Sequence, residues 1–128
     1  MQKLRNVKVI VGGIEFDSKR EAKRWGELLM LERAGAITDL ERQVKFELIP
    51  KQVETVPRYG KTGKRLKDGE RVVEKSCDYI ADFAYTRDGE RVVEDVKGYR
   101  DPSSASYAKF VIKRKLMLWI YGIKVLEA

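Results

Sequence analysis

The sequence predicts a mixed α/β (α+β) fold whose core runs helix, three strands, helix, strand, after an N-terminal β-hairpin. Three observations indicate it. Residues 18–34 are capped like a helix, residues 43–49 alternate apolar and polar side chains, and an Asp-Gly pair separates two strand-like runs. A chain of 128 residues can bury one core of ordinary size, so we expect a single domain over residues 1–128.

The N-terminal segment predicts a hairpin followed by a helix. Residues 8–16 contain two short apolar runs around a glycine pair, a pattern typical of a tight turn between strands. Ser18 and Glu21 then form an S-x-x-E capping box, and good helix formers continue to Ala34. Gly35 is the expected helix stop.

The middle of the chain predicts the three core strands. They are residues 43–49, 77–85 and 91–97, and the last two flank the turn Arg87-Asp88-Gly89-Glu90 and should pair antiparallel. Between the first and second strands, residues 58–75 are glycine-punctuated and strongly basic, which indicates an exposed loop or a protruding hairpin.

The C-terminal part predicts one helix and one strand. After a polar link over residues 100–104, a helix is expected from Ala105 to Tyr121, with Gly122 as its stop. Residues 123–126 should form the last strand. Apolar residues fall on more than one side of this helix, which favours cover by the sheet on one side and by a second subunit on the other.

Composition limits the possible chemistry. The net charge is +7, which favours a polyanionic partner such as nucleic acid. The absence of histidine excludes Ser-His-Asp hydrolysis, histidine-dependent nucleases and imidazole-bound zinc, and the single cysteine cannot supply a thiolate cluster. Any metal must therefore be bound by oxygen. We find no apolar stretch long enough to span a membrane, and we expect a cytoplasmic protein.

Three charged residues are predicted to converge on one face of the sheet. Side chains alternate along a strand, so Asp95 and Lys97 share a face while Glu94 points to the other. The strand that carries Asp82 should lie alongside. Two carboxylates and an ammonium suit a Mg²⁺ site that hydrolyses phosphodiesters. The ordinary interpretation of an acid-x-Lys triplet is a surface ion pair.

The order of these elements resembles the PD-(D/E)XK nuclease superfamily. Ala81-Asp82-Phe83 is similar to its "PD" element, with alanine in place of proline, and Glu94-Asp95-Val96-Lys97-Gly98 is similar to its "(D/E)XK" element. The resemblance is closest to short phage and prophage proteins known only as a domain of unknown function, and extends to Holliday-junction resolvases. It implies a restriction-endonuclease-like core, with Asp82 and Asp95 as metal ligands and Lys97 as a catalytic residue.

Two further residues are candidates through the same resemblance. Many members of the superfamily add a glutamate from the first helix to the metal site, and by position this is Glu21. The helical wheel places Glu21 on the apolar stripe that faces the sheet, although its part in the capping box explains a glutamate there equally well. Gln43 is a possible contact to water or phosphate, and an exposed glutamine at the end of a strand is the alternative.

Basic residues in two segments are candidates for DNA contact. The alternatives are a solvated loop for the first segment and basic side chains extending from a packed helix for the second. Tyr59 and Tyr107 are candidates for stacking on bases or for ordinary packing. The predicted DNA-binding residues are Lys61, Lys64, Arg65, Lys67, Lys109 and Lys113.

The sequence thus predicts a Mg²⁺-dependent DNA endonuclease, with Mn²⁺ as a substitute metal. Its resemblance implies selectivity for branched or junction DNA in phage replication or recombination, within a bacterial host, and a homodimer. Little of the chain is left for reading bases, which argues against a sequence-specific nuclease. The alternatives are a non-catalytic DNA-binding accessory protein that retains the nuclease fold, and a nuclease directed at RNA.

Overall fold

The computed structural model describes residues 7–97, 101 and 103–128, and the chain divides into two compact units. The first unit contains the chain up to Lys45 and from Ile80 onward, and the second is Phe46–Tyr79. Gly98 of the predicted acid-x-Lys element and part of the polar link at 100–104 lie outside the described residues.

The N-terminal hairpin and the first helix form as their local signals predict. β1 (Val9–Val11) pairs antiparallel with β2 (Ile14–Phe16), and both glycines of the turn have positive φ angles of 59° and 80°. α1 (Lys19–Arg33) begins after the N-cap Ser18, whose hydroxyl accepts a hydrogen bond from the Glu21 backbone N–H at 3.1 Å. The helix ends before Gly35, which has a φ of 79°.

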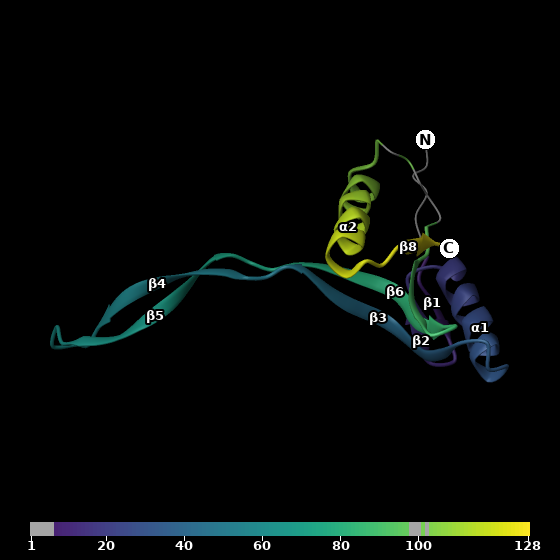
Figure 1. Cartoon of the computed structure of the whole chain (residues 1–128), viewed down its shortest axis with the longest axis horizontal. Helices are drawn as coiled ribbons and strands as arrows, with labels where there is room; N and C mark the ends of the chain where they lie inside the picture. The colour runs from purple at the N-terminus through teal and green to yellow at the C-terminus, as the bar shows by residue number, and fades with distance from the viewer. Residues whose placement is uncertain (1–6, 98–100, 102) are drawn as a thin grey trace. The chain divides into compact units, whose positions relative to one another are not determined.

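A four-stranded mixed sheet forms the centre of the first unit (Figure 1). Its strands lie in the order β3 (Thr38–Ile49), β6 (Cys77–Arg87), β7 (Glu90–Asp95) and β8 (Val125–Glu127). β6 and β7 are antiparallel and β7 and β8 are parallel. α1 and α2 (Ala105–Tyr121) lie on opposite sides of the sheet. The predicted α-β-β-β-α-β order and mixed α+β class are confirmed.

Two strand boundaries near the candidate site differ from the prediction. β3 begins at Thr38, five residues before Gln43, so Gln43 lies inside the strand and does not open it. β7 ends at Asp95, and Lys97 follows the strand while its backbone N–H still donates to the Ala128 carbonyl at 3.3 Å. Strand ends depend on the pairing available from neighbours, which local propensity does not encode.

The core between α1 and the sheet is built on four buried residues, Leu28, Ile37, Phe83 and Tyr85. The indole of Trp25 stacks on the Phe83 ring with 5.8 Å between ring centroids. Phe83 and Leu28 have no exposed surface. Burial of large apolar side chains is the main favourable term in folding, so this cluster fixes α1 against the strands that carry the candidate acids.

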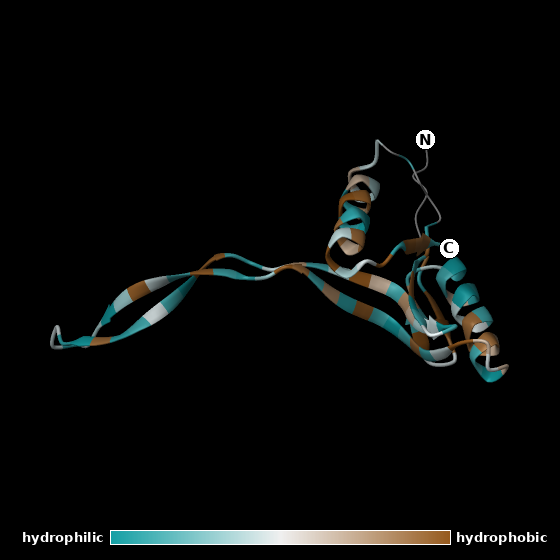
Figure 2. Cartoon of the chain, in the orientation of Figure 1, coloured by the Kyte–Doolittle hydropathy of each residue, from teal (hydrophilic) through white to brown (hydrophobic). Residues whose placement is uncertain are grey.

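α2 packs on one side and exposes apolar residues on another. Ser104 caps its start, Gly122 with a φ of 68° ends it, and Phe110 and Met117 are its buried residues. Figure 2 shows hydrophobic residues spread along this helix, of which Ile112, Leu118 and Trp119 are exposed, Trp119 at 86%. The predicted second subunit that would cover this side stays a prediction. Within the described part of the chain, no helix is long and apolar enough to cross a membrane.

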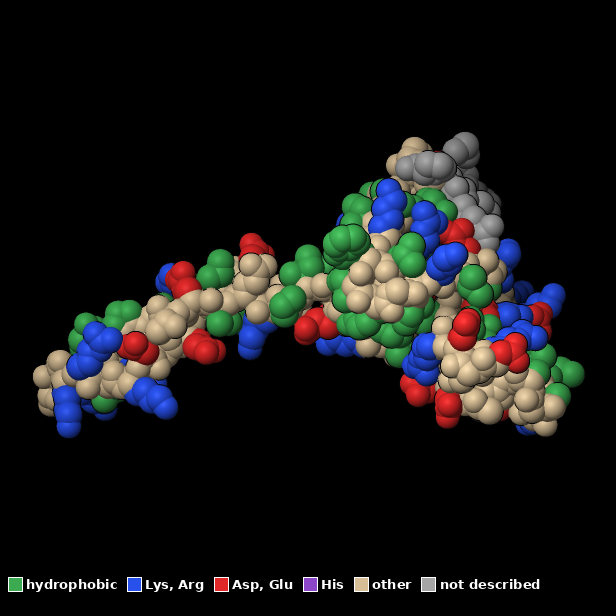
Figure 3. Space-filling model, in the orientation of Figure 1, with side chains coloured by type: hydrophobic (Ala, Val, Ile, Leu, Met, Phe, Trp, Pro, Cys, Tyr) green, Lys and Arg blue, Asp and Glu red, His purple; other side chains and the backbone are tan. Residues whose placement is uncertain are grey.

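The second unit is dominated by a two-stranded antiparallel hairpin. β4 (Gln52–Tyr59) pairs with β5 (Arg65–Glu74), so the predicted basic segment 58–75 contains the turn and one whole strand. Gly63 has a φ of 81° in the turn. Nearly every side chain of the two strands is exposed, and Figure 3 shows Lys and Arg gathered at the turn end of the hairpin.

Candidate active site

Asp82 and Asp95 meet across the β6–β7 pair. Phe83 pairs with Glu94, and the next position of the same register brings Asp82 opposite Asp95 on the other face. Asp95 is buried at 6% exposure, and Asp82 is partly buried. One carboxylate oxygen of Asp82 accepts the Val96 backbone N–H at 2.8 Å. The predicted convergence of the two acids is therefore present in the structure.

The electrostatics of Asp82 reflect this crowding. Burial is the main cause that raises the pKa of Asp82 to about 7, and the nearby charges of Asp95 and Glu21 contribute to the rise. The hydrogen bond from the Val96 backbone acts in the opposite direction and lowers that pKa. Three carboxylates from α1, β6 and β7 thus influence one another, with Arg42 and Lys97 as cations beside them.

Lys97 lies directly beside Asp95. Its ammonium Nζ is 3.1 Å from Asp95 Oδ1 and 4.0 Å from the centroid of the Phe110 ring of α2. A cation over an aromatic face is attracted by the ring quadrupole, so Phe110 holds the ammonium from the side opposite the sheet. Sequence reasoning missed Phe110, because it looks like one more core aromatic of an amphipathic helix.

Two contacts to the last strand anchor the part of α2 that carries Phe110. The Tyr107 hydroxyl donates to Glu127 Oε1 at 2.9 Å, and Arg114 donates to the same oxygen at 3.2 Å. The hydrogen bond to Glu127 raises the pKa of the Tyr107 hydroxyl. Tyr107 is therefore engaged inside the protein, which favours its packing role over base stacking.

Glu21 projects from α1 and is buried at 4% exposure, as its place on the helical wheel predicts. Its Oε1 accepts a hydrogen bond from the Gln43 side-chain amide at 3.3 Å and lies 3.9 Å from a guanidinium nitrogen of Arg42. Burial raises the pKa of Glu21, and the charges of Asp17 and Asp95 add to this rise. The two interpretations of Glu21, as a cap residue and as a site residue, are thus compatible in one side chain.

Gln43 and Arg42 hold Glu21 from β3. Gln43 has a φ of 51°, a left-handed backbone conformation that is uncommon for glutamine and costs on the order of 1 kcal/mol. The Arg42 guanidinium lies over the Phe16 ring at 4.5 Å and near Trp25 at 5.7 Å. Sequence reasoning missed Arg42, since nothing in its local pattern indicates a contact with a helix about twenty residues earlier.

Glu94 lies on the opposite face of β7, as predicted, and is fully engaged there. The Arg24 guanidinium binds both of its carboxylate oxygens at 2.7 and 2.8 Å, and the Tyr85 hydroxyl donates to one of them. Burial and this bond raise the pKa of Tyr85 to about 12. The pairing gives Glu94 a structural role and explains why it is buried as a charged group.

The donor set fits a hard divalent cation by chemistry, although its side chains are turned to protein partners. Glu21, Asp82 and Asp95 supply only carboxylate oxygens, the ligands that Mg²⁺ prefers. As they lie, each accepts or pairs with a donor of the protein, and among the described residues no group of three acidic, Cys or His side chains is arranged to hold a metal ion. A metal would have to displace some of these contacts.

The predicted DNA-binding residues fall in both units. In the hairpin, Arg65 pairs with Asp68 at 2.6 Å and lies 5.9 Å from the centroid of the exposed Tyr59 ring. On α2, Lys109 is exposed and Lys113 is partly buried. The remaining hairpin candidates are exposed: Lys61, Lys64 and Lys67.

Comparison with known families gives one match. Residues 1–123 match the model of the family described as "Protein of unknown function (DUF1064)". No curated protein and no solved structure matches the chain.

Proposed function

We propose that this chain, which belongs to the DUF1064 family, is a metal-dependent DNA endonuclease related to the PD-(D/E)XK superfamily. The observation that carries the proposal is the convergence of Asp82, Asp95 and Lys97 at the end of the β6–β7 pair, with Glu21 influencing both acids from α1. A surface ion pair would not need two further buried carboxylates beside it.

The buried acids support a catalytic role better than a structural one. Burying several like charges together disfavours their ionised form, and the pKa values of Asp82 and Glu21 are raised accordingly. Glu94 shows the contrasting case, because it is paired with the Arg24 guanidinium through both oxygens and accepts a hydrogen bond from Tyr85. Crowded carboxylates with raised pKa values are characteristic of functional sites.

Glu21, Asp82 and Asp95 are the residues that would hold Mg²⁺, or Mn²⁺ in its place. A bound divalent ion supplies charge neutralisation at the phosphodiester and acidifies water. Lys97, held between Asp95 and the Phe110 ring, would orient the nucleophile or neutralise charge that develops on the phosphate. Gln43 would keep Glu21 pointed at the site through its amide.

The substrate we propose is DNA, with branched or junction DNA favoured by the resemblance to resolvases. Basic residues outside the carboxylate cluster would bind phosphates of the DNA backbone. Contacts to phosphate carry no information about the base sequence. The proposed contacts are Lys61, Lys64, Arg65 and Lys67 of the hairpin with Lys109 and Lys113 of α2. A homodimer through the exposed apolar side of α2, and a place in phage replication or recombination in the bacterial cytoplasm, belong to the same proposal.

A non-catalytic DNA-binding accessory protein is the second candidate. It is favoured by one observation, namely that the carboxylates are turned to protein donors and form no ready metal-binding group among the described residues. Acids near the phosphate path would weaken such a binder unless a metal were present. Dependence of binding or cleavage on a divalent ion therefore separates the two functions.

The decisive experiment is cleavage of labelled linear, flapped and four-way-junction DNA by the full chain, with Mg²⁺, Mn²⁺ or EDTA. We expect metal-dependent cleavage that falls at least about 100-fold in Asp82→Asn, Asp95→Asn and Lys97→Ala. Glu90→Gln is the matched control, because Glu90 is an exposed acid at the start of β7, the strand that carries Asp95. Paired RNA substrates test the RNA alternative.

Two results would overturn the proposal. One is cleavage that survives in EDTA or in Asp95→Asn. The other is salt-sensitive DNA binding by folded protein that never cleaves and does not respond to divalent ions, which would assign the chain to the accessory function.

A further inference from the structure

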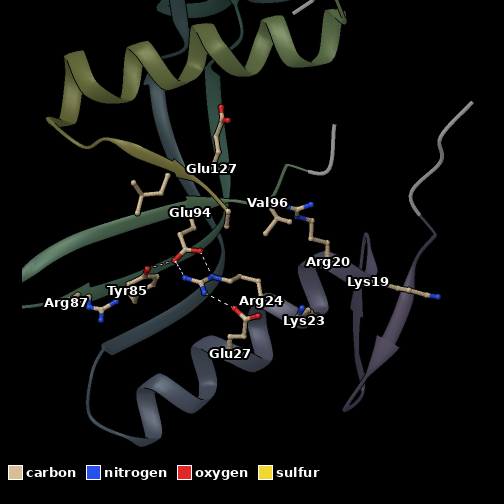
Figure 4. Close-up of a pocket in the computed structure, with 12 residues that line it drawn as sticks. Lys19, Arg20, Lys23, Arg24, Glu27, Tyr85, Arg87, Glu94, Val96 and Glu127 are labelled. Atoms are coloured by element: carbon tan, nitrogen blue, oxygen red, sulfur yellow. Dashed lines mark hydrogen bonds and ion pairs between the residues drawn. The ribbon is translucent and has the colours of Figure 1, made fainter. Parts of the chain in front are cut away.

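An open pocket of about 810 Å³ lies in the first unit, outside the candidate active site. It is lined by residues of α1, β6, β7 and the end of the chain, as Figure 4 shows. On β7 and directly after it the lining residues are Glu94 and Val96, which alternate with Asp95 and Lys97 and so face the other side. The pocket and the candidate site therefore share α1, β6 and β7 but occupy different faces of the sheet.

The acidic side chains of the pocket each have a basic partner in the protein. Arg24 binds Glu94 through both carboxylate oxygens and also pairs with Glu27 at 2.9 Å. Glu127 points toward α2, where it accepts hydrogen bonds from Tyr107 and Arg114 (Figure 4). The lining contains five basic side chains against these three acidic ones, so basic groups are in excess in the pocket.

The basic residues of the pocket are not neutralised in the same way. Arg20 and Lys23 come from α1 and Arg87 comes from the end of β6, and all three are exposed. Within the part of the chain that the structure describes, none of the three has an ion pair or hydrogen bond to an acidic side chain. Lys19 also lines the rim, but Figure 4 shows its side chain directed away from the others.

We propose that this basic pocket binds phosphate groups of a nucleic-acid backbone. Arg20, Lys23 and Arg87 approach it from two elements, and cations that are exposed and unpaired lose little by releasing water to bind phosphate. The choice of nucleic acid over an acidic protein rests on the net charge of +7 and on the proposed function. If DNA is the substrate, the pocket would hold backbone phosphates on either side of the DNA segment that lies at the candidate site. This follows because α1 and β7 contribute residues to the pocket and to the candidate site.

The test is DNA binding by the full chain in EDTA, measured by fluorescence anisotropy on a labelled duplex over a series of salt concentrations. We compare Arg20→Gln, Lys23→Gln and Arg87→Gln with the wild type. The matched control is Arg33→Gln, because Arg33 is a basic residue of α1 that does not line the pocket. Circular dichroism confirms that each variant is folded.

Each pocket substitution is expected to weaken binding about fivefold at 0.15 M salt and to reduce the slope of log K against log salt by about 0.9. Arg33→Gln should leave both quantities unchanged. Equal effects of all four substitutions, or no effect of the three, would overturn the proposal. The proposal would also be overturned if the three substitutions weakened the binding of polyglutamate or of inorganic phosphate but left DNA binding unchanged.

The result is independent of whether the chain cleaves DNA. If the pocket variants bind DNA weakly and neither they nor the wild type cleave it, the pocket proposal is supported and the nuclease proposal fails. If the wild type cleaves in Mg²⁺ and the pocket variants bind and cleave like it, the nuclease stands and the pocket proposal fails.

Discussion

The candidate active site and the β4–β5 hairpin both concentrate charge, but they do so in opposite surroundings. Glu21 and Asp95 are buried and lie close enough to influence one another, whereas the basic side chains at the hairpin turn are exposed. Charge in a buried setting interacts strongly and shifts pKa values, while charge in water is screened within about 10 Å. The first region is therefore suited to chemistry at a fixed point and the second to attraction of a polyanion.

The two regions also differ in what stabilises them. Phe83 is fully buried and stacks on Trp25, while Val72 of the hairpin is 50% exposed. A two-stranded ribbon has no covered face of its own, so its apolar residues contribute little. Its cross-strand contacts include the Arg71–Glu54 ion pair and the close fit of Gly69 against the Arg58 side chain.

The largest effect on stability is expected when an apolar side chain is truncated in the buried region, and the smallest when one is truncated in the exposed hairpin. Phe83→Ala should lower the free energy of unfolding by about 3 to 5 kcal/mol, because it opens a cavity under α1. Val72→Ala should change it by no more than about 0.5 kcal/mol. Urea unfolding followed by circular dichroism measures both values. A loss from Val72→Ala as large as that from Phe83→Ala would contradict the contrast between buried and exposed regions.

The next effect is expected from the hairpin charges. Replacing Lys61, Lys64, Arg65 and Lys67 together with glutamine should weaken DNA binding about 100-fold at 0.15 M salt. The estimate counts three free cations, because Arg65 already pairs with Asp68. Salt-dependent anisotropy measures the loss, and kcat for cleavage should not change.

The matched control for the hairpin is Arg71→Gln. Arg71 is a basic residue of the same hairpin that is paired with Glu54, so its removal should weaken binding far less than the removal of an unpaired lysine. A fall in kcat for the fourfold variant at saturating DNA would mean that the hairpin takes part in the chemical step and not only in binding.

The third contrast concerns the titration of Asp82, a buried-site property that the exposed hairpin charges lack. Its pKa is about 7 in the folded protein against an ordinary value of 3.8, so the folded state holds a proton that the unfolded state releases. Stability without metal should therefore fall as pH rises from about 4 to about 7 and then level off. Asp82→Asn should remove this fall and raise the melting temperature at pH 8.

Thermal unfolding between pH 5 and pH 8 in EDTA measures this change. Asp88→Asn is the control, because Asp88 is an exposed acid in the β6–β7 turn and should leave the profile unchanged. Added Mg²⁺ should raise the melting temperature of the wild type at pH 8 more than that of Asp82→Asn. An identical response of the two proteins would argue against Asp82 as a metal ligand.

The element order could be predicted because its signals are local. Ser18 and Gly35 bound the first helix, Asp88-Gly89 makes the turn between β6 and β7, and Gly122 ends α2. Each depends on backbone conformations that a few adjacent residues decide. The boundaries of β3 and β7 were less predictable, since pairing with distant strands extends or ends them.

The candidate site was predictable in part. Alternation along a strand assigns Asp95 and Lys97 to one face and Glu94 to the other, and the helical wheel turns Glu21 inward. These assignments follow from the periodicity of strands and helices and need no knowledge of the rest of the chain. The ion-pair partner of Glu94 could not be predicted in this way, because Arg24 lies 70 residues away in the sequence.

The sequence by itself therefore determined the order of the elements, the face on which each charged residue lies, and the oxygen-only chemistry of any metal site. Only the tertiary structure decided that Lys97 lies over Phe110, that Gln43 adopts a left-handed backbone to reach Glu21, and that a basic pocket forms beside α1. The reason is physical. Periodicity and capping act between near neighbours, whereas these contacts depend on how the helices and the sheet pack, which is set by the sum of many weak long-range contacts.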